Sequence, residues 1–173
     1  MTDDLQIIKA TLSHLEILES ISKQSFVETY ADKNTEENIA NYLTENFDSE
    51  PLIRQLNNSL SEFYLAYINN SVVGYLKINS GNAQTEQQND NAIEIERIYV
   101  LKEFQGKRIG QLLCNKAFQI GQQKKAEYLW LGVWEENFKA IRFYKKYGFI
   151  EFDRHMFKLG VDEQQDIMMK LNL

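Results

Sequence analysis

Several residue types are scarce in this chain of 173 residues, and each scarcity excludes a class of protein. The single cysteine, Cys114, excludes an internal disulfide framework and a cysteine-based metal cluster. The two histidines, His14 and His155, are far apart in the sequence, and we expect no metal site. The longest apolar stretches are much shorter than the roughly 18–20 residues of a membrane-spanning helix. The acidic N-terminus shows no signal-peptide pattern, so we expect a cytoplasmic protein without a membrane partner.

Positive charge is also in the minority, with 19 Lys and Arg against 25 Asp and Glu. The net charge of −6 argues against a nucleic-acid partner, because such proteins usually carry a basic footprint. The charges are unevenly distributed. Residues 1–62 carry 12 acidic and 4 basic residues, whereas residues 102–125 carry six basic residues and one acidic residue. Taken alone, this asymmetry is typical of scattered solvated faces.

The remaining composition is that of a folded protein. Hydrophobic residues make up 43% of the chain and aromatic residues 12%, which is enough for a core. There is one proline, Pro51, and no Gly/Ser-rich linker, so we expect one domain over residues 1–173. The polar stretch from Asn79 to Asn91 predicts an exposed loop, and it is the segment most prone to disorder.

Hydrophobic periodicity and turn residues predict an alternation of strands and helices. Ser13 with Glu16 forms a capping-box pattern, and Thr35 begins a second helix. Asn69 and Asn70 predict a hairpin turn, because asparagine tolerates positive φ. The order is strand, helices, three strands, helix, strand, helix and two strands, which predicts an α/β fold with helices on a largely antiparallel sheet. Strands are expected at 5–10, 63–68, 72–78, 92–100, 128–134, 149–157 and 166–171, and helices from 13, over 35–47, after 51, and over 110–125 and 137–147.

The first candidate for chemistry is the loop from Gln105 to Gly110, QGKRIG, between a strand that ends at Val100 and a helix. Such a loop can direct backbone N–H groups at an anion, and the N-terminus of the helix adds partial positive charge. Lys107 and Arg108 add full charges, although such a pair is more often solvated surface. The P-loop and GxGxxG patterns are absent.

The second candidate is the helix that follows Trp134. Asn137 is placed to cap this helix, Ala140 is small, and Gly148 is a good residue for its C-terminal end. Taken alone, this pattern predicts an ordinary amphipathic helix.

Together the two segments are more specific for one family than either is alone. The chain carries QGKRIG and then N-x-x-A-x-x-F-Y-x-x-x-G-F, which begins 32 residues after Gln105. With these motifs it resembles, over its whole length, the GNAT superfamily of acyl-CoA-dependent N-acetyltransferases. The stretches 94–100 and 130–135 resemble most closely the bacterial spermidine/spermine N-acetyltransferases. The resemblance implies a mixed, mostly antiparallel sheet of about seven strands with helices on both faces. Arg108 departs from the family's loop, because it occupies the position of the first glycine, and it would donate its N–H if its φ were negative.

The resemblance implies acetyl-CoA as co-substrate, with no metal. It places the pyrophosphate on the loop, the pantetheine arm at Asn137, a phosphate near Lys146 and the leaving thiolate at Tyr144. A backbone N–H near Ile98 to Val100 would bind the oxyanion if that strand turns away from its neighbour. The expected cofactor-binding residues are Ile98, Tyr99, Val100, Gln105, Gly106, Lys107, Arg108, Ile109, Gly110, Asn137, Tyr144 and Lys146.

Acetyl transfer to an amine requires that the amine lose a proton, because alkyl amines titrate near pH ~10. Glu94 and Glu96 share one strand parity, so both are candidate general bases beside Tyr144 as the catalytic acid. The resemblance favours Glu94. Pairing of either carboxylate with Arg97 or a neighbouring strand is the alternative.

The expected substrate is a small polyamine, acetylated by direct attack in a ternary complex. The acidic first third supplies Glu28, Asp32, Glu36 and Glu37 as partners for a polycation, and Trp134 is a further candidate in the substrate channel. A protein N-terminus, a lysine side chain or another small amine is the alternative substrate. A non-catalytic CoA-binding regulator is the alternative of another class. The sequence leaves a homodimer open.

Overall fold

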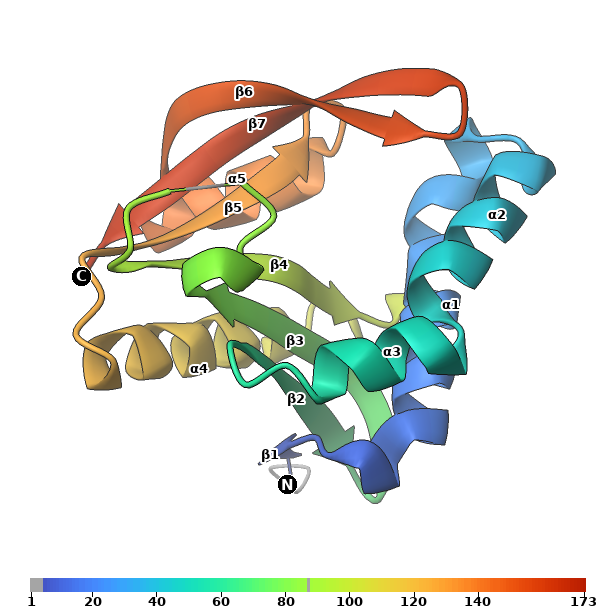
Figure 1. Cartoon of the computed structure of the whole chain (residues 1–173), viewed down its shortest axis with the longest axis horizontal. Coiled ribbons are helices and arrows are strands. Elements are labelled where there is room, and N and C mark those ends of the chain that lie inside the picture. The colour runs from blue at the N-terminus through green and yellow to red at the C-terminus, as the bar shows by residue number, and fades with distance from the viewer. Residues whose placement is uncertain (1–4, 87) are drawn as a thin grey trace.

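A seven-stranded sheet runs through the molecule, with the strands in the order β1-β2-β3-β4-β5-β7-β6 (Figure 1). The computed structural model describes residues 5–86 and 88–173. The strands are β1 (Leu5–Lys9), β2 (Ser61–Ile68), β3 (Ser71–Ser80), β4 (Ala92–Val100), β5 (Tyr128–Trp134), β6 (Ile150–Leu159) and β7 (Asp162–Asn172). The helices are α1 (Leu15–Tyr30), α2 (Glu36–Phe47), α3 (Ser49–Leu56), α4 (Ile109–Gln123) and α5 (Phe138–Tyr147).

The pair β4–β5 is parallel, and the other strand pairs of the sheet are antiparallel. The mixed, mostly antiparallel sheet predicted from the sequence is therefore confirmed. The parallel ladder is short, since it runs only from Ala92↔Tyr128 to Glu94↔Trp130. Beyond this point β4 and β5 diverge (Figure 1), and the sheet opens between them.

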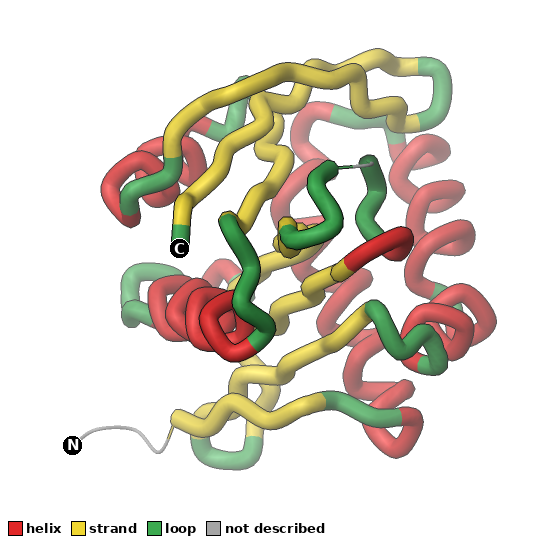
Figure 2. The backbone as a smooth tube through the Cα atoms, turned by 60° about the vertical axis from the view of Figure 1, so that its left-hand side comes forward, coloured by secondary structure: helices red, strands yellow, loops and turns green. Residues whose placement is uncertain are grey.

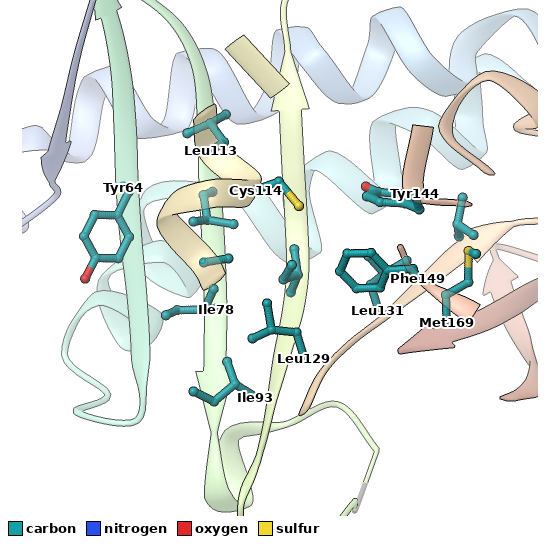
Figure 3. Close-up of a cluster of buried hydrophobic side chains, with 14 of the residues drawn as sticks. Tyr64, Ile78, Ile93, Leu113, Cys114, Leu129, Leu131, Tyr144, Phe149 and Met169 are labelled. Carbon is teal, nitrogen blue, oxygen red and sulfur yellow. The ribbon is translucent and has the colours of Figure 1, made fainter. Parts of the chain in front are cut away.

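Helices cover both faces of the sheet (Figure 2), and the two faces differ in composition. The face under α4 and α5, here called the apolar face, carries an almost wholly hydrophobic cluster (Figure 3) that includes Leu113, Cys114 and Leu129. The face under α1, α2 and α3, here called the charged face, combines a second apolar cluster with the buried side chains of Lys77, Glu94 and Arg97. Cys114 is completely buried, as its position on the apolar side of the helix predicted.

Most local signals in the sequence act as predicted. The Thr35 hydroxyl accepts a hydrogen bond from the Asn38 N–H at 3.2 Å at the start of α2. Asn69 and Asn70 have φ values of 48° and 65° in the β2–β3 turn. Gly148, with φ of 115°, ends α5 in a left-handed conformation that favours glycine.

The start of α1 differs from the prediction. A 3₁₀ turn (Leu12–His14) precedes the helix, and the Thr11 N–H donates to Nδ1 of His14 at 3.0 Å. The Ser13 hydroxyl is instead 2.8 Å from that of Thr11. The predicted capping box of Ser13 and Glu16 is therefore wrong, because the chain turns two residues earlier.

The polar stretch from Asn79 to Asn91 is only partly an exposed loop. Strand β3 extends to Ser80, and Asn79 is completely buried with its amide bonded to Glu94. Gln84 then accepts a hydrogen bond from Nε1 of Trp130 at 2.6 Å. Polar side chains of this stretch therefore form hydrogen bonds with buried polar groups on the charged face. The expected disorder at residue 87 lies outside the described residues.

The β6–β7 hairpin is longer than predicted and arches over the sheet toward α2 (Figure 1). At its tip, Asn38 of α2 donates to Asp162 at 2.9 Å, and the rings of Tyr42 and Phe157 lie 5.9 Å apart. These contacts close one end of the charged face.

Candidate active site

A cleft of about 790 Å³ lies where β4 and β5 diverge. Its walls come from β4, the segment that leads into α4, the end of β5, α5, and the C-terminal turn of α1. Beyond Glu94 the ladder between β4 and β5 ends, and Ile98, Tyr99 and Val100 line the cleft. The condition set for an oxyanion donor, a strand that turns away from its neighbour, is therefore met.

A β-bulge determines which side chains of β4 reach this cleft. Lys77 pairs with Arg97 and Ile78 pairs with Ile95, so Glu96 is the extra residue. Glu96 and Arg97 then lie on the same side of the sheet, with the Arg97 guanidinium 4.7 Å from the centre of the Phe47 ring. The bulge gives the charged face two adjacent ionic side chains.

The loop from Gln105 to Gly110 forms one end of the cleft, and all its residues except Lys107 line it. Gly106 has φ of 83° and Arg108 has φ of 64°. The condition of negative φ for N–H donation by Arg108 is therefore not met, because a φ of 64° lies in the left-handed region that glycine adopts without strain. A Cβ added at Gly110 would meet its nearest atoms, on Phe143 and Val100, at 3.9 Å. The cleft is thus open above Gly110.

Helix α5 provides the opposite wall of that end. Asn137 caps the helix by accepting a hydrogen bond from the Ala140 N–H at 3.2 Å, and Asn137 also lines the cleft. Lys139 donates to Gln105 at 2.6 Å, which joins α5 to the loop. Lys146, the predicted phosphate partner, lines the cleft as well.

Tyr144 lies between the apolar cluster and the cleft. Tyr144 is only 7% exposed, and its hydroxyl oxygen lies on the β4 side of the ring (Figure 3). Burial raises the pKa of Tyr144 well above its usual range. The phenol is therefore protonated at neutral pH, which a hydrogen-bond donor to a developing anion requires.

Glu94 and Glu96 lie on the same side of the sheet, since the Asn79 amide donates to both, at 3.0 and 2.6 Å. Glu94 does not line the cleft. It is 3% exposed, accepts the Thr85 N–H at 2.8 Å, and has a pKa raised chiefly by burial. Glu96 does line the cleft. Arg97 and Lys77 outweigh its burial and lower the pKa of Glu96 to about 2.

The sequence analysis missed the partner of Glu96, Lys77. Lys77 is 5% exposed, and its Nζ is ion-paired with Glu96. Burial and the nearby Arg97 lower the pKa of Lys77 to about 8, while Glu96 opposes this shift. The signal was present, because Lys77 shares the strand parity of the buried Tyr75 and Asn79.

The acidic residues of the first third divide into two groups. Glu28 and Asp32 line the cleft together with Trp134, whereas Glu36 and Glu37 do not. The Glu28 carboxylate accepts the Lys102 N–H at 2.8 Å, so it also joins α1 to the segment after β4.

Three further cleft residues carried no signal in the sequence. Tyr30 lies with its ring centre 5.9 Å from that of Trp134. Lys33, in the 3₁₀ turn Ala31–Lys33, is ion-paired with Glu136 at 2.7 Å, although 103 residues separate them.

The cleft lining carries charges of both signs. The loop region and α5 contribute Lys102, Arg108, Lys139 and Lys146, whereas Glu28 and Asp32 lie at the end of α1; Lys33 and Glu136 form an ion pair within the same lining. Among residues 5–86 and 88–173, no cluster of His, Cys, Asp and Glu forms a candidate metal site. Within the same part of the chain, no helix is long and apolar enough to cross a membrane.

Comparisons with known proteins agree with this geometry. The sequence profile of the acetyltransferase (GNAT) family matches residues 18–149. An uncharacterized N-acetyltransferase from Lactobacillus delbrueckii subsp. lactis is 34% identical over 96% of both chains. A spermidine N(1)-acetyltransferase from Thermoplasma acidophilum is 27% identical over 84% of this chain and 88% of its own.

The fold has the same relatives. The crystal structure of the PaiA N-acetyltransferase from Thermoplasma acidophilum in complex with coenzyme A superposes with a TM-score of 0.80 and 25% identity, covering 98% of this chain and 99% of that one. The family profile spans most of the chain, and the fold is shared over nearly its full length. The chain therefore belongs to the acetyltransferase (GNAT) family, as its two motifs predicted, and it is an acetyl-CoA-dependent N-acetyltransferase.

Proposed function

We propose that this enzyme acetylates a primary amine of a small polyamine, such as spermidine or spermine, by direct attack in a ternary complex. The observation that carries the proposal is the set of charged side chains that lines one cleft together with Tyr144 and the open edge of β4. The loop and α5 contribute Arg108, Lys139 and Lys146, and the end of α1 contributes Glu28 and Asp32, beside which Lys33 is paired with Glu136. A polyanionic donor would bind at the basic group and a polycationic acceptor at the acidic one.

The residues of the basic group suit the acetyl-CoA substrate. The loop and the N-terminus of α4 line the cleft, and backbone N–H groups there would favour phosphate oxygens. Arg108 and Lys146 add full positive charges, and the uncrowded Gly110 allows close approach. Asn137 is proposed to bind the pantetheine arm.

The reacting thioester is proposed to lie against β4. An N–H from Ile98 to Val100 would bind the oxyanion, since β5 no longer pairs with β4 there. Tyr144 would donate a hydrogen bond to the departing thiolate. An ordinary thiol titrates near ~8.5, so stabilisation of the thiolate by this hydrogen bond is easier than full proton transfer from a phenol with a raised pKa.

Of the two candidate bases, Glu96 has the better geometry. Glu96 lines the cleft, and its carboxylate is held there by Lys77, Arg97 and Asn79. With a pKa near 2 it holds a proton only transiently, so we propose that it passes the amine proton on to water. Glu94, which the resemblance favoured, is separated from the cleft lining by burial and by its bonds to Thr85. Its role as base stays a prediction that Glu94→Gln and Glu96→Gln, compared by pH–rate profiles, will test.

A substrate screen tests the proposal. The purified enzyme and acetyl-CoA are supplied with spermidine, spermine, monoamines, amino acids and peptides, and kcat/KM is compared. We expect the polyamines to be the best substrates. Higher kcat/KM for peptide N-termini, lysine or another small amine would replace the polyamine with that substrate. Tight CoA binding without turnover of any amine would instead support the non-catalytic regulator.

Salt dependence separates charge attraction from other causes of selectivity. Exposed charges are screened beyond about 8–10 Å at physiological salt, so kcat/KM for spermine should fall more steeply with salt than that for a monoamine. Asp32→Asn should raise KM for spermine, whereas Glu36→Gln, outside the cleft lining, serves as the matched control. Equal effects of the two substitutions would contradict the acidic wall.

A further inference from the structure

An ammonium group of the protein itself occupies one corner of the cleft. Nζ of Lys33 lies 2.7 Å from Oε2 of Glu136 and 4.9 Å from the centre of the Trp134 ring. All three residues line the cleft. A carboxylate and the face of an indole together form a binding site for a primary alkylammonium ion.

The lysine side chain is a four-carbon alkyl chain that ends in an ammonium, and this is the chemistry of one end of a diamine or polyamine. We propose that Trp134 and Glu136 form a subsite for the second ammonium of the substrate. Lys33 fills this subsite in the free enzyme and leaves it when the substrate binds. This inference rests on the proposed polyamine activity, and it adds Glu136 and Lys33, which the sequence did not assign, to the predicted Trp134.

The receiving side of the subsite is preorganised. Trp134 pairs with Asp166 of β7, and its ring lies beside that of Tyr30. Glu136 sits in the tight turn closed by the hydrogen bond from the Asn137 N–H to the Trp134 carbonyl at 2.9 Å. The turn leads directly into α5, the helix that carries Tyr144. A second ammonium bound here would therefore be held at the turn that leads into the helix carrying Tyr144.

The occupant is replaceable. The side chains of Lys33 and Glu136 are 52% and 51% exposed, and exposed ion pairs of this kind are weak. When Lys33 leaves, its ammonium enters water, and the substrate ammonium restores the charge balance at Glu136. The exchange costs little, and only a substrate with a second ammonium gains from it.

Two substitutions with matched controls test the exchange. Lys33→Met removes the occupant, and Glu136→Gln removes the charge of the subsite. Lys145→Met and Glu135→Gln are the controls, because these residues lie outside the cleft lining and pair with Glu151 and Arg154. KM is measured for unbranched diaminoalkanes of increasing length and for n-alkylamines of the same length.

We expect Lys33→Met to lower KM for diamines by about two- to fivefold and Glu136→Gln to raise it by at least as much, as for loss of an exposed pair. Monoamine KM values and both controls should stay at the parental level. The chain length with the largest response gives the spacing between the subsite and the reacting amine. Equal shifts for diamines and monoamines would overturn the subsite, because only diamines carry the second ammonium.

A binding measurement separates this inference from the polyamine proposal. A bis-quaternary alkylammonium ion cannot be acetylated, so calorimetry on the CoA-loaded protein measures its binding without turnover. If diamines are poor substrates but this ion binds more tightly to Lys33→Met and more weakly to Glu136→Gln, the subsite stands and the polyamine substrate is wrong. If diamines are good substrates but both variants behave like their controls, the subsite is wrong and the polyamine proposal stands.

Discussion

The two faces of the sheet solve different problems with different chemistry. The apolar face buries aliphatic and aromatic side chains such as Leu113 and Phe149 under α4 and α5, and Tyr144 is the residue there that brings a hydroxyl to the cleft. The charged face buries Lys77 and Arg97 as an ionic network around one glutamate, Glu96. Apolar packing thus positions the side chains on one side of the cleft, and ion pairs position those on the other side. A hydroxyl removed from the first face should change the rate, whereas a charge removed from the second should change stability.

The largest effect is expected on the apolar face. Tyr144→Phe should lower kcat by about 10²–10³-fold, as for loss of one preorganised hydrogen-bond donor to a developing anion. The ring still packs, so Kd for CoA and the free energy of unfolding should change little. Tyr147→Phe, one turn further along α5, is the matched control, because the Tyr147 hydroxyl is bonded to Asn115 at 2.5 Å. If chemistry limits turnover and kcat for Tyr144→Phe stays within about twofold of the parent, the proposed hydrogen bond from Tyr144 to the departing thiolate is wrong.

On the charged face, Glu96→Gln should cost about 3–5 kcal/mol of unfolding free energy, because it leaves Lys77 and Arg97 without their shared anion. Lys77→Met should cost much less, since Glu96 keeps Arg97 as its partner. Urea denaturation of both variants at neutral pH measures this difference. Similar losses for the two would show that the cluster does not act as two cations around one anion.

The acid limb of the stability curve sharpens the same comparison. The pKa of Glu96 is depressed from about 4.5 to about 2 in the folded protein. Its contribution to stability is therefore complete above pH 4.5 and is lost as pH falls toward 2. Lys77→Met removes one of the two cations that depress this pKa, so its acid-dependent loss of stability should be smaller than that of the parent and should be complete at a higher pH. If the parent and Lys77→Met lose stability identically as the pH falls, the assignment of this loss to Glu96 is wrong.

A smaller effect is expected at the loop between the two faces. Gly110→Val should raise Kd for CoA by about tenfold or more, equivalent to about 1.4 kcal/mol, because the side chain fills the open approach to the backbone. The nearest protein atoms are 3.9 Å from its Cβ, so the fold should tolerate the change. Gly110→Ala is expected to lie between the parent and the valine variant in calorimetry. If both variants bind CoA as tightly as the parent, the assignment of CoA to this loop is wrong.

The smallest effect is expected at the neighbouring Arg108. Its φ of 64° costs a non-glycine residue about 1–2 kcal/mol, part of which the added flexibility of the unfolded chain cancels. Arg108→Gly should therefore raise the unfolding free energy by up to about 1 kcal/mol and, by removing a cation, weaken CoA binding severalfold. Lys107→Gly is the control, since Lys107 lies outside the cleft lining and its ammonium is 4.8 Å from the Phe104 ring centre. A lower free energy of unfolding for Arg108→Gly than for the parent would show that the backbone of Arg108 is not strained.

Sequence and structure agree where the determinant is local. The cap at Thr35, the Asn69–Asn70 turn and the ends of α5 follow from single residues whose backbone preferences act over a few positions. The mixed, mostly antiparallel sheet of about seven strands followed from the two motifs through a resemblance to a family. These features required no knowledge of distant contacts.

The remaining features depend on partners that only the tertiary fold brings together. Asn79 looks like loop polarity in the sequence, yet it is buried because Ser61 and two glutamates satisfy its amide. The choice between Glu94 and Glu96 depends on Thr85, which the fold brings to Glu94, and the placement of Glu96 beside Arg97 depends on a bulge that strand parity does not reveal. Lys33 and Glu136 become partners only when the ends of α1 and β5 meet.

The placement of the two tryptophans gives the molecule an optical property. Trp130 is completely buried, whereas Trp134 is partly exposed in the cleft beneath the Lys33 ammonium. Trp130 therefore fluoresces from an apolar surrounding that ligands do not reach, and Trp134 from a wet, charged one. A cation that replaces Lys33 changes the emission of only one of the two indoles, and the other serves as an internal reference for binding titrations.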